Sequence, residues 1–299
     1  MASTVISPAD HRCEVVRRLA YRRLEPAVER LRLATEADFD DVVHDLRKRC
    51  KRVRSLLRLV RESLGEDVYK SENRVLRDAA RVVSPVRDAA VLIEVHDDLV
   101  QAGAMPMAGL RTELVERHQE LRRQVLDEGA LPQLGETIAA VLARIETWPL
   151  ESLEWETLSP GVKRIYRRGR KAMAAAYDDP STERFHEWRK RTRYLRHQLG
   201  FLKELWPEVI SGNVKSAHAL TDVLGEAHDL ALLRQAVETT GTDLGGDGER
   251  LCELIASRRA LLRVRAEPIG RRLYAEKPSR FVARLGQYWD AGNRSGAAA

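Results

Sequence analysis

The chain has 299 residues, of which 43% are hydrophobic and 32% are charged, and its formal net charge is +6. This composition supports a packed core and excludes general disorder, and no segment approaches the roughly 20 apolar residues that a membrane-spanning helix requires. The three cysteines lie far apart and form no CxxC pair, which indicates a reducing, cytoplasmic location and argues against a zinc site.

Helical periodicity runs through nearly the whole sequence and predicts an all-α fold. In the first half, the expected helices span residues 10–34, 39–64, 68–83, 85–103, 108–128 and 133–147. In the second half, they span residues 161–177, 181–204, 208–224, 226–239, 246–275 and 279–290. Ser84 followed by Pro85 is a typical helix start, and Gly65 is a plausible stop.

The helix expected at 39–64 is strongly basic. From His44 to Arg61 it carries eight Lys or Arg residues and a single acid, Asp45. On a helical wheel the cationic side chains gather on one side, and apolar residues such as Val53 and Leu57 gather on the other. We call the cationic side the first stripe, which consists of His44, Arg47, Lys48, Lys51, Arg54 and Arg58.

The helix expected at 181–204 repeats this design. From His186 to Arg196 it carries five Lys or Arg residues and one acid, Glu187. Trp188 and Leu195 fall on its apolar side. Its cationic side, the second stripe, consists of His186, Arg189, Lys190, Arg193 and Arg196. Outside these two segments the chain sums to a net charge of −5, so the positive charge is focused, and focused charge attracts a polyanion.

The two stripes align at an offset of 142 residues, which pairs His44 with His186 and Arg47 with Arg189. Further on, SPVRDAAVL resembles GEAHDLALL, and this match aligns Asp88 with Asp229. We therefore expect an internal repeat, with two antiparallel helical bundles of about four helices each, plus short extra helices, related by a pseudo-twofold axis. The expected boundaries are 10–147 for the first repeat, 148–160 for a linker, 161–290 for the second repeat and 291–299 for a disordered tail.

The composition of the stripes favours a phosphate-rich ligand. Surface helices usually intersperse acids among their basic residues, and the stripes nearly lack them. Arginine binds phosphate oxygens in bidentate fashion, lysine supplies a mobile charge, and both would repel a metal cation. A solvated basic face remains the alternative interpretation. If the stripes do bind a ligand, their length suits a repeating anion better than a single phosphate.

The motif HxxRKxxK, from His44 to Lys51, and its partner HxxRKxxR, from His186 to Arg193, resemble the CHAD family, the conserved histidine α-helical domain. The resemblance covers about residues 10–290 and is strengthened by Arg87–Asp88 and His228–Asp229. It implies two four-helix bundles whose basic faces meet along a groove or pore. Members bind inorganic polyphosphate and can associate with polyphosphate granules. Some are fused to a triphosphate-tunnel domain, and this chain resembles the standalone form.

For this chain the resemblance implies that inorganic polyphosphate binds between the two repeats, with recruitment to granules as a further expectation. The implied ligands are His44, Arg47, Lys48, Lys51, Arg54, His186, Arg189, Lys190, Arg193 and Arg196, to which the first stripe adds Arg58. The halves also differ, because Arg52 is matched by Tyr194 and Arg87 by His228. The sequence contains no nucleotide-binding loop, nucleophile elbow or paired carboxylates beside the stripes, so we expect no catalysis and no cofactor or metal.

A second tier of contacts is expected on the neighbouring helices, where structural or solvent roles are the alternative. Its members are Tyr21, Arg22, Arg74, Arg81, Arg164, Arg168, Lys171, Lys215 and His218. A carboxylate facing a polyanion would be repelled, so Asp88 and Asp229 are expected to pair with a neighbouring arginine or histidine. His197 is expected to be a solvated helix residue.

Three other functions stay open from the sequence. A histidine phosphotransfer bundle also exposes an imidazole near basic residues, although it needs one reactive histidine rather than two long stripes. A nucleic-acid binder would use the same charge, but it usually adds aromatic side chains for base stacking, and the stripes hold few. A scaffold whose charge serves a protein partner is the third alternative.

Overall fold

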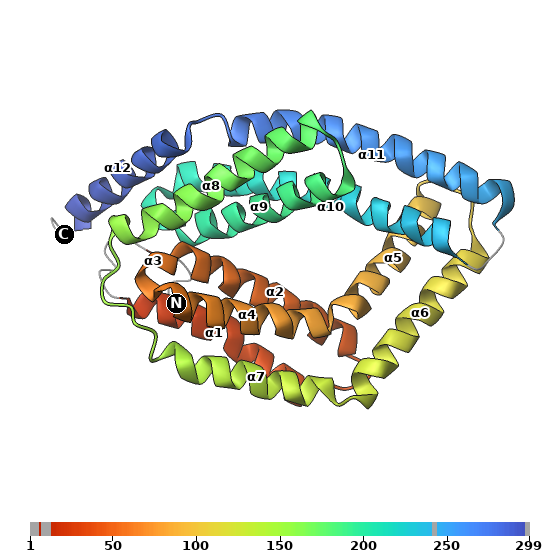
Figure 1. Ribbon diagram of the computed structural model, residues 1–299, viewed down its shortest axis with the longest axis horizontal. Coiled ribbons are helices and arrows are strands. Elements are labelled where there is room, and N and C mark those ends of the chain that lie inside the picture. The colour runs from red at the N-terminus through yellow and green to blue at the C-terminus, as the bar shows by residue number, and fades with distance from the viewer. Residues whose placement is uncertain (1–5, 7–12, 241–243, 297–299) are drawn as a thin grey trace.

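The structure, a computed structural model, describes residue 6 and residues 13–240 and 244–296. The described chain is all-α, as predicted (Figure 1). The first half contains α1 (Glu14–Arg32), α2 (Phe39–Leu59), α3 (Arg61–Leu64), α4 (Glu66–Val82), α5 (Ser84–Gln101), α6 (Ala108–Asp127) and α7 (Ala130–Ile145). The second half contains α8 (Trp155–Asp178), α9 (Thr182–Phe201), the short 3-10 helix η1 (Lys203–Leu205), α10 (Pro207–Thr239), α11 (Gly245–Leu273) and α12 (Pro278–Gly296).

Four helices of the first half form a closed bundle. α1 packs against α2 and α7, and α4 packs against the same two helices from the other side. Each helix turns an apolar face inward, so that Leu24, Leu46, Leu76 and Ile138 are all fully buried. Burial of such side chains stabilises the bundle by roughly 1.5–3 kcal/mol for each large residue.

The second half is built around α8, α9 and α10, which pack side by side in chain order, while α11 packs on α10 and α12 packs on α8. Aromatic side chains fill the spaces between these helices. Tyr166 stacks on Phe281 with ring centroids 4.0 Å apart, and Trp188 is fully buried against Gly270 of α11.

Helices α5 and α6 form an antiparallel arm that leaves the first bundle and reaches the second half (Figure 1). α5 packs against α10, and Glu113 of α6 accepts a hydrogen bond from Thr240 at the end of α10. Both helices were expected within the first repeat, residues 10–147. They join the two halves on one side, while α2 contacts α8 and α9 directly on the other.

The contact between α2 and α8 depends on a glycine. A Cβ atom added at Gly161 would lie 2.8 Å from the carbonyl oxygen of Arg58 and closer still to that of Leu59. Only a residue without a side chain therefore allows α8 to cross the end of α2. This crossing, together with the packing of α2 on α9, sets the position of the two basic helices.

Several expected helix boundaries were wrong. The helices expected at 208–224 and 226–239 are a single helix, α10, which continues through Gly225. The first half breaks at the matching position because Pro85 follows Ser84 there, and proline cannot continue the preceding helix. The helix expected at 39–64 is divided at Val60 into α2 and α3, and the one expected at 181–204 ends at Phe201 and is followed by η1.

The expected linker and tail also need correction. α8 begins at Trp155, inside the expected linker 148–160, because Glu154 and Thr157 form a capping box. α12 continues to Gly296, so residues 291–296 of the expected disordered tail are helical, while residues 297–299 lie outside the described residues. The start of the helix expected at 10–34 also falls in part outside them. The internal repeat itself stays a prediction.

Within the described residues, no helix combines the length and the apolarity needed to cross a membrane.

Candidate functional site

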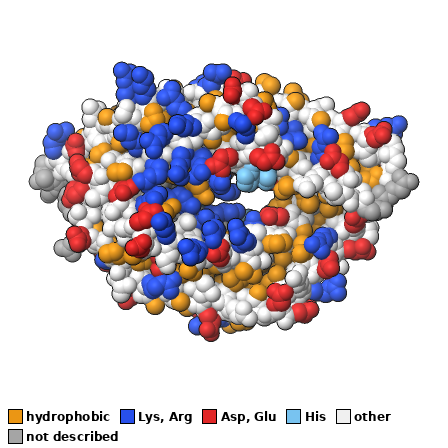
Figure 2. All heavy atoms as spheres, viewed as in Figure 1, with side chains coloured by type: hydrophobic (Ala, Val, Ile, Leu, Met, Phe, Trp, Pro, Cys, Tyr) orange, Lys and Arg blue, Asp and Glu red, His pale blue; other side chains and the backbone are white. Residues whose placement is uncertain are grey.

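Lys and Arg side chains gather around an opening near the middle of the molecule, with histidine side chains at its rim (Figure 2). The corresponding cavity, called here the central cavity, has a volume of about 460 Å³ and lies between α2, α9, α5 and α10. Its lining residues are His44, Arg47, Lys48, Lys51, Arg52, Arg87, Asp88, Val91, His186, Arg189, Arg193, Arg196, His197, His228, Asp229 and Leu232. Eight of these are Lys or Arg, four are His and only two are acids.

The cavity brings together most residues of the two predicted stripes. From the first stripe it collects His44, Arg47, Lys48 and Lys51, and from the second His186, Arg189, Arg193 and Arg196. Helical periodicity explains this result, because spacings of three and four residues place these side chains on one face. The opposite faces are buried in the bundles, as Leu46 and Val53 are on α2 and Leu195 is on α9.

Three stripe residues do not line the central cavity. Arg54 donates a hydrogen bond to Asn73 of α4 at 3.1 Å, and the Arg58 guanidinium lies 4.3 Å from the ring centroid of Tyr194. Lys190 forms an ion pair with Glu187 on its own helix. The partners of Arg54 and Arg58 lie on other helices, which the helical wheel of α2 does not include, whereas the partner of Lys190 lies on its own helix.

The second-tier residues lie elsewhere as well, and none of the nine lines the central cavity. Arg164 pairs with Glu62, and His218 pairs with Asp222 at 2.7 Å. Tyr21 and Arg22 border a separate pocket beside α7. The remaining members, namely Arg74, Arg81, Arg168, Lys171 and Lys215, are exposed on the outer surface.

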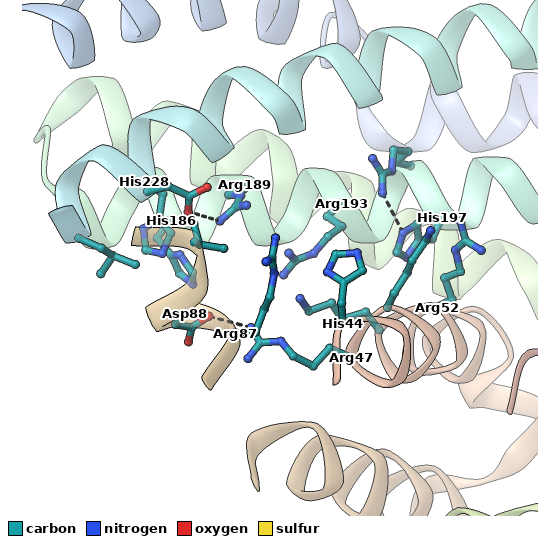
Figure 3. Close-up of a pocket in the computed structure, with 16 residues that line it drawn as sticks. His44, Arg47, Arg52, Arg87, Asp88, His186, Arg189, Arg193, His197 and His228 are labelled. Atoms are coloured by element: carbon teal, nitrogen blue, oxygen red, sulfur yellow. Dashed lines mark hydrogen bonds and ion pairs between the residues drawn. The ribbon is translucent and has the colours of Figure 1, made fainter. Parts of the chain in front are cut away.

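Both acids of the cavity pair with an arginine, as expected from their position beside the stripes. Arg47 Nη2 lies 2.9 Å from Asp88 Oδ1, and Arg189 Nη1 lies 3.7 Å from Asp229 Oδ1 (Figure 3). The predicted repeat matches Arg47 with Arg189 and Asp88 with Asp229, so the two ion pairs occupy equivalent positions in the two halves. Because each carboxylate is held by its own arginine, the surface facing the cavity remains strongly positive.

The geometry leaves two cationic donor atoms of the cavity without a partner. Within the described part of the chain, Arg47 Nη1 and Arg193 Nε are buried and make no hydrogen bond. A buried unpaired donor costs free energy that an incoming acceptor would restore. Both donors lack an acceptor, which the oxygens of an anion would supply on reaching them.

Burial, together with neighbouring like charges, lowers the pKa values of two cationic groups in the cavity, Lys51 and Arg193. Burial lowers the pKa of Lys51 to about 7, and the neighbouring Arg193 and Arg47 contribute to the shift. Burial, followed by Arg189, lowers the pKa of Arg193 to about 10. Both shifts mean that burial and neighbouring cations destabilise the charged forms of these side chains. A bound anion would stabilise the charged forms.

The cavity histidines are also poorly suited to carry charge without an anion. His186 and His228 lie with ring centroids 4.3 Å apart, at one end of the row of residues in Figure 3. Burial and then His186 lower the pKa of His228 to about 3, while burial and then Arg189 lower the pKa of His186. For His44, burial and then Arg87 lower the pKa. The cavity therefore favours neutral imidazoles.

Sequence reasoning missed four lining residues as ligands, namely Arg52, Arg87, His197 and His228. Arg87 and His228 carried a usable signal, because each precedes an aspartate that the repeat aligns. The expectation for His197 was wrong: this side chain lies between the two halves, with Nδ1 3.1 Å from Ser55 Oγ of α2 and Nε2 3.2 Å from Arg196 Nη2. A contact between two helices 142 residues apart has no signature in local periodicity.

Comparison with known families gives one match. The family model of the CHAD domain matches residues 16–238, well over half of the chain, and this range includes both stripes and every residue that lines the central cavity. No curated protein matches the chain.

Proposed function

Because the chain belongs to the CHAD domain family, we propose that it binds inorganic polyphosphate in the central cavity between its two halves. The family is associated with the binding of polyphosphate and triphosphate in general. The observation that carries the proposal for this chain is the lining of the cavity, where eight Lys or Arg side chains face two carboxylates that are already paired.

Capture is electrostatic in this account. Polyphosphate carries a negative charge on each unit, and the rows of cations on α2 and α9 would replace the counterions along it. Arginines such as Arg193 would bind two phosphate oxygens at once, whereas Lys51 would act as a point charge. Because the donors repeat along both helices, a repeating anion can occupy more of them than a single phosphate can.

The surroundings of the aromatic residues favour polyphosphate over single-stranded nucleic acid. Base stacking requires an accessible aromatic face. Trp188 is fully buried, and Tyr194 is 6% exposed and covered by the Arg58 guanidinium. Apart from the histidines, no aromatic side chain is among the described residues that line the cavity.

We further propose that the protein is a binding module rather than an enzyme. Polyphosphate cleavage assisted by Mg²⁺ needs carboxylates to hold the metal ion. Asp88 and Asp229 are the two carboxylates of the cavity, and each is paired with an arginine. A module that binds polyphosphate without cleaving it would accumulate at polyphosphate granules.

The test is titration calorimetry with long-chain polyphosphate on the parent protein and on the double variant Arg189→Gln/Arg193→Gln. We expect tight binding by the parent and a loss of at least about tenfold in the variant, since each charge-assisted contact contributes roughly 1.5–3 kcal/mol. The matched control is Arg123→Gln/Arg250→Gln, which removes the same charge from exposed positions on α6 and α11 and should bind like the parent.

Equal losses in the two double variants would contradict binding in the cavity. Preference for DNA or RNA over polyphosphate at matched salt would instead support a nucleic-acid binder. Transfer of labelled phosphate onto His186 or His228 from a phosphodonor would support histidine phosphotransfer.

A further inference from the structure

A second basic cavity adjoins the central one. This outer cavity has a volume of about 340 Å³ and is lined by Arg23, Arg52, Arg196, His197, Gly200, Phe201, Lys203, Val214 and His218. Arg52, Arg196 and His197 line both cavities. In Figure 3, Arg52 and His197 lie beside each other at the end of the row opposite to His186 and His228. The outer cavity therefore begins where the central cavity ends.

The cationic row of α9 continues into the outer cavity. Arg189, Arg193, Arg196 and Gly200 follow one another at spacings of four, three and four residues, which keeps them on one face of α9. At a rise of about 1.5 Å per residue, this face extends roughly 16 Å from Arg189 to Gly200. Lys203 follows in η1, after α9 has ended at Phe201, and it lines the outer cavity as well.

The charge of the outer cavity is also unbalanced. Arg23 of α1 adds a cation from the first half, and its pKa is lowered by burial and then by Arg52 and Arg49. Among the described residues, no acid lines this cavity, and none forms an ion pair with Arg23, Arg52 or Lys203. The nearby Asp222 is engaged by His218 at 2.7 Å.

Gly200 leaves the floor of the outer cavity open. A Cβ atom at this position would meet no heavy atom within 4 Å, although Gly200 lies inside α9 with helical geometry. A side chain at this position would project into open space beside the outer cavity, which Arg196 and Lys203 also line. The absence of one leaves room for a ligand between these two cations.

We propose that a phosphate chain held in the central cavity passes Arg52 and Arg196 and continues into the outer cavity, where Arg23 and Lys203 bind its next units. This inference rests on the proposed function, and it explains how the protein would distinguish long polyphosphate chains from short ones. A chain that fills only the central cavity gains nothing from the outer cations, whereas a longer chain engages both sets. The outer cavity therefore makes the protein selective for long polyphosphate.

The first test introduces a negative charge on the open floor. Gly200→Glu should weaken the binding of long-chain polyphosphate roughly fivefold to tenfold and change the binding of inorganic triphosphate by less than about twofold. Gly246→Glu is the matched control, because Gly246 also lies in a helix, in open space and outside both cavities. It should leave the affinity for both ligands unchanged.

The second test removes the outer cations in the variant Arg23→Gln/Lys203→Gln. We expect the same selective loss for the long chain, with unchanged helical content by circular dichroism. If the parent binds long polyphosphate and neither variant changes the ratio of long-chain to triphosphate affinity, the outer cavity has no part in binding. If the parent binds neither ligand, the proposed function itself is wrong.

Discussion

Lys51 lines the central cavity, so its ionisation should respond to what occupies that cavity. Its pKa is lowered to about 7 by burial and by Arg193 and Arg47, so a large fraction of the side chains is neutral near neutral pH. A bound polyanion favours the ammonium form and raises this pKa. Binding at pH 7 should therefore take up protons, and the affinity should fall as the pH rises from 7 to 9.

Titration calorimetry in two buffers of different ionisation enthalpy measures this uptake. Lys51→Met should reduce the uptake and flatten the decline of affinity above pH 7. The variants His44→Ala and His186→Ala test proton uptake below pH 7. The pKa values of both histidines are lowered, so any protons that they take up on binding are taken up in that lower pH range. Binding by the parent with no proton uptake at pH 7 would show that Lys51 does not face the ligand.

The same residue predicts a trade-off between stability and binding. The pKa of Lys51 in the folded protein lies below the ordinary value of 10.5, so the unfolded chain binds more protons between pH 7 and 10.5. The cost of the buried charge is fully present below pH 7, and stability is regained as the pH rises through that window. Lys51→Met removes the cost and should stabilise the ligand-free fold at pH 7 by about 1 kcal/mol while weakening polyphosphate binding.

Urea unfolding at pH 7 measures the change in stability, and Lys215→Met, an exposed lysine on α10, is the matched control. Greater stabilisation by the control than by Lys51→Met would contradict the assigned cost of the buried ammonium group.

At the scale of residues, most of the central cavity could be predicted because its cations lie on single helices. Spacings of three and four residues place Arg47 and Lys51 on one face of α2, and Arg189 and Arg193 on one face of α9. The role of His197 could not be predicted in this way. Its neighbours include Ser55 on another helix, and only the packing of α2 against α9 brings them together.

At the scale of elements, the crossing of α2 and α8 holds the two halves at a set distance. Gly161→Ala would force a Cβ atom against the carbonyl groups of Arg58 and Leu59, which are backbone atoms and cannot rotate away. We expect a loss in the free energy of unfolding of about 2 kcal/mol or more, together with weaker polyphosphate binding because the walls of the cavity move.

Gly200→Ala is the control for this prediction, since the new Cβ atom there meets open space inside a helix. It should stabilise the protein by up to about 1 kcal/mol, because alanine favours the helical conformation over glycine. Thermal unfolding of both variants separates the two effects. Equal stability of the two variants would mean that α8 can shift away from α2 at no cost.

Helix boundaries were predictable where a local signal decides them. Pro85 after Ser84 marks the start of α5, and Gly65 precedes α4. The continuity of α10 could not be read from Gly225, because glycine lowers helix propensity. Packing explains why a glycine stands at position 225, since a Cβ atom there would approach the Arg189 guanidinium to 3.2 Å.

At the scale of the whole molecule, the cavity is a property of both halves together. α2 supplies one wall and α9 another, and Asp88 of α5 and Asp229 of α10 each orient one arginine. The all-α class and the two basic helices could be predicted from periodicity and charge. The arm formed by α5 and α6 could not, because an amphipathic helix packs equally well within a bundle or between two halves.

The dependence of polyphosphate affinity on salt concentration tests the central claim most directly. If the cavity captures polyphosphate by counterion release, the logarithm of the affinity should fall linearly with the logarithm of the salt concentration. The slope should become shallower by roughly 0.7 for each cation removed, in Arg193→Gln and again in Arg189→Gln/Arg193→Gln, but not in Arg123→Gln. An affinity that does not change with salt, or a slope equally reduced by Arg123→Gln, would contradict the account.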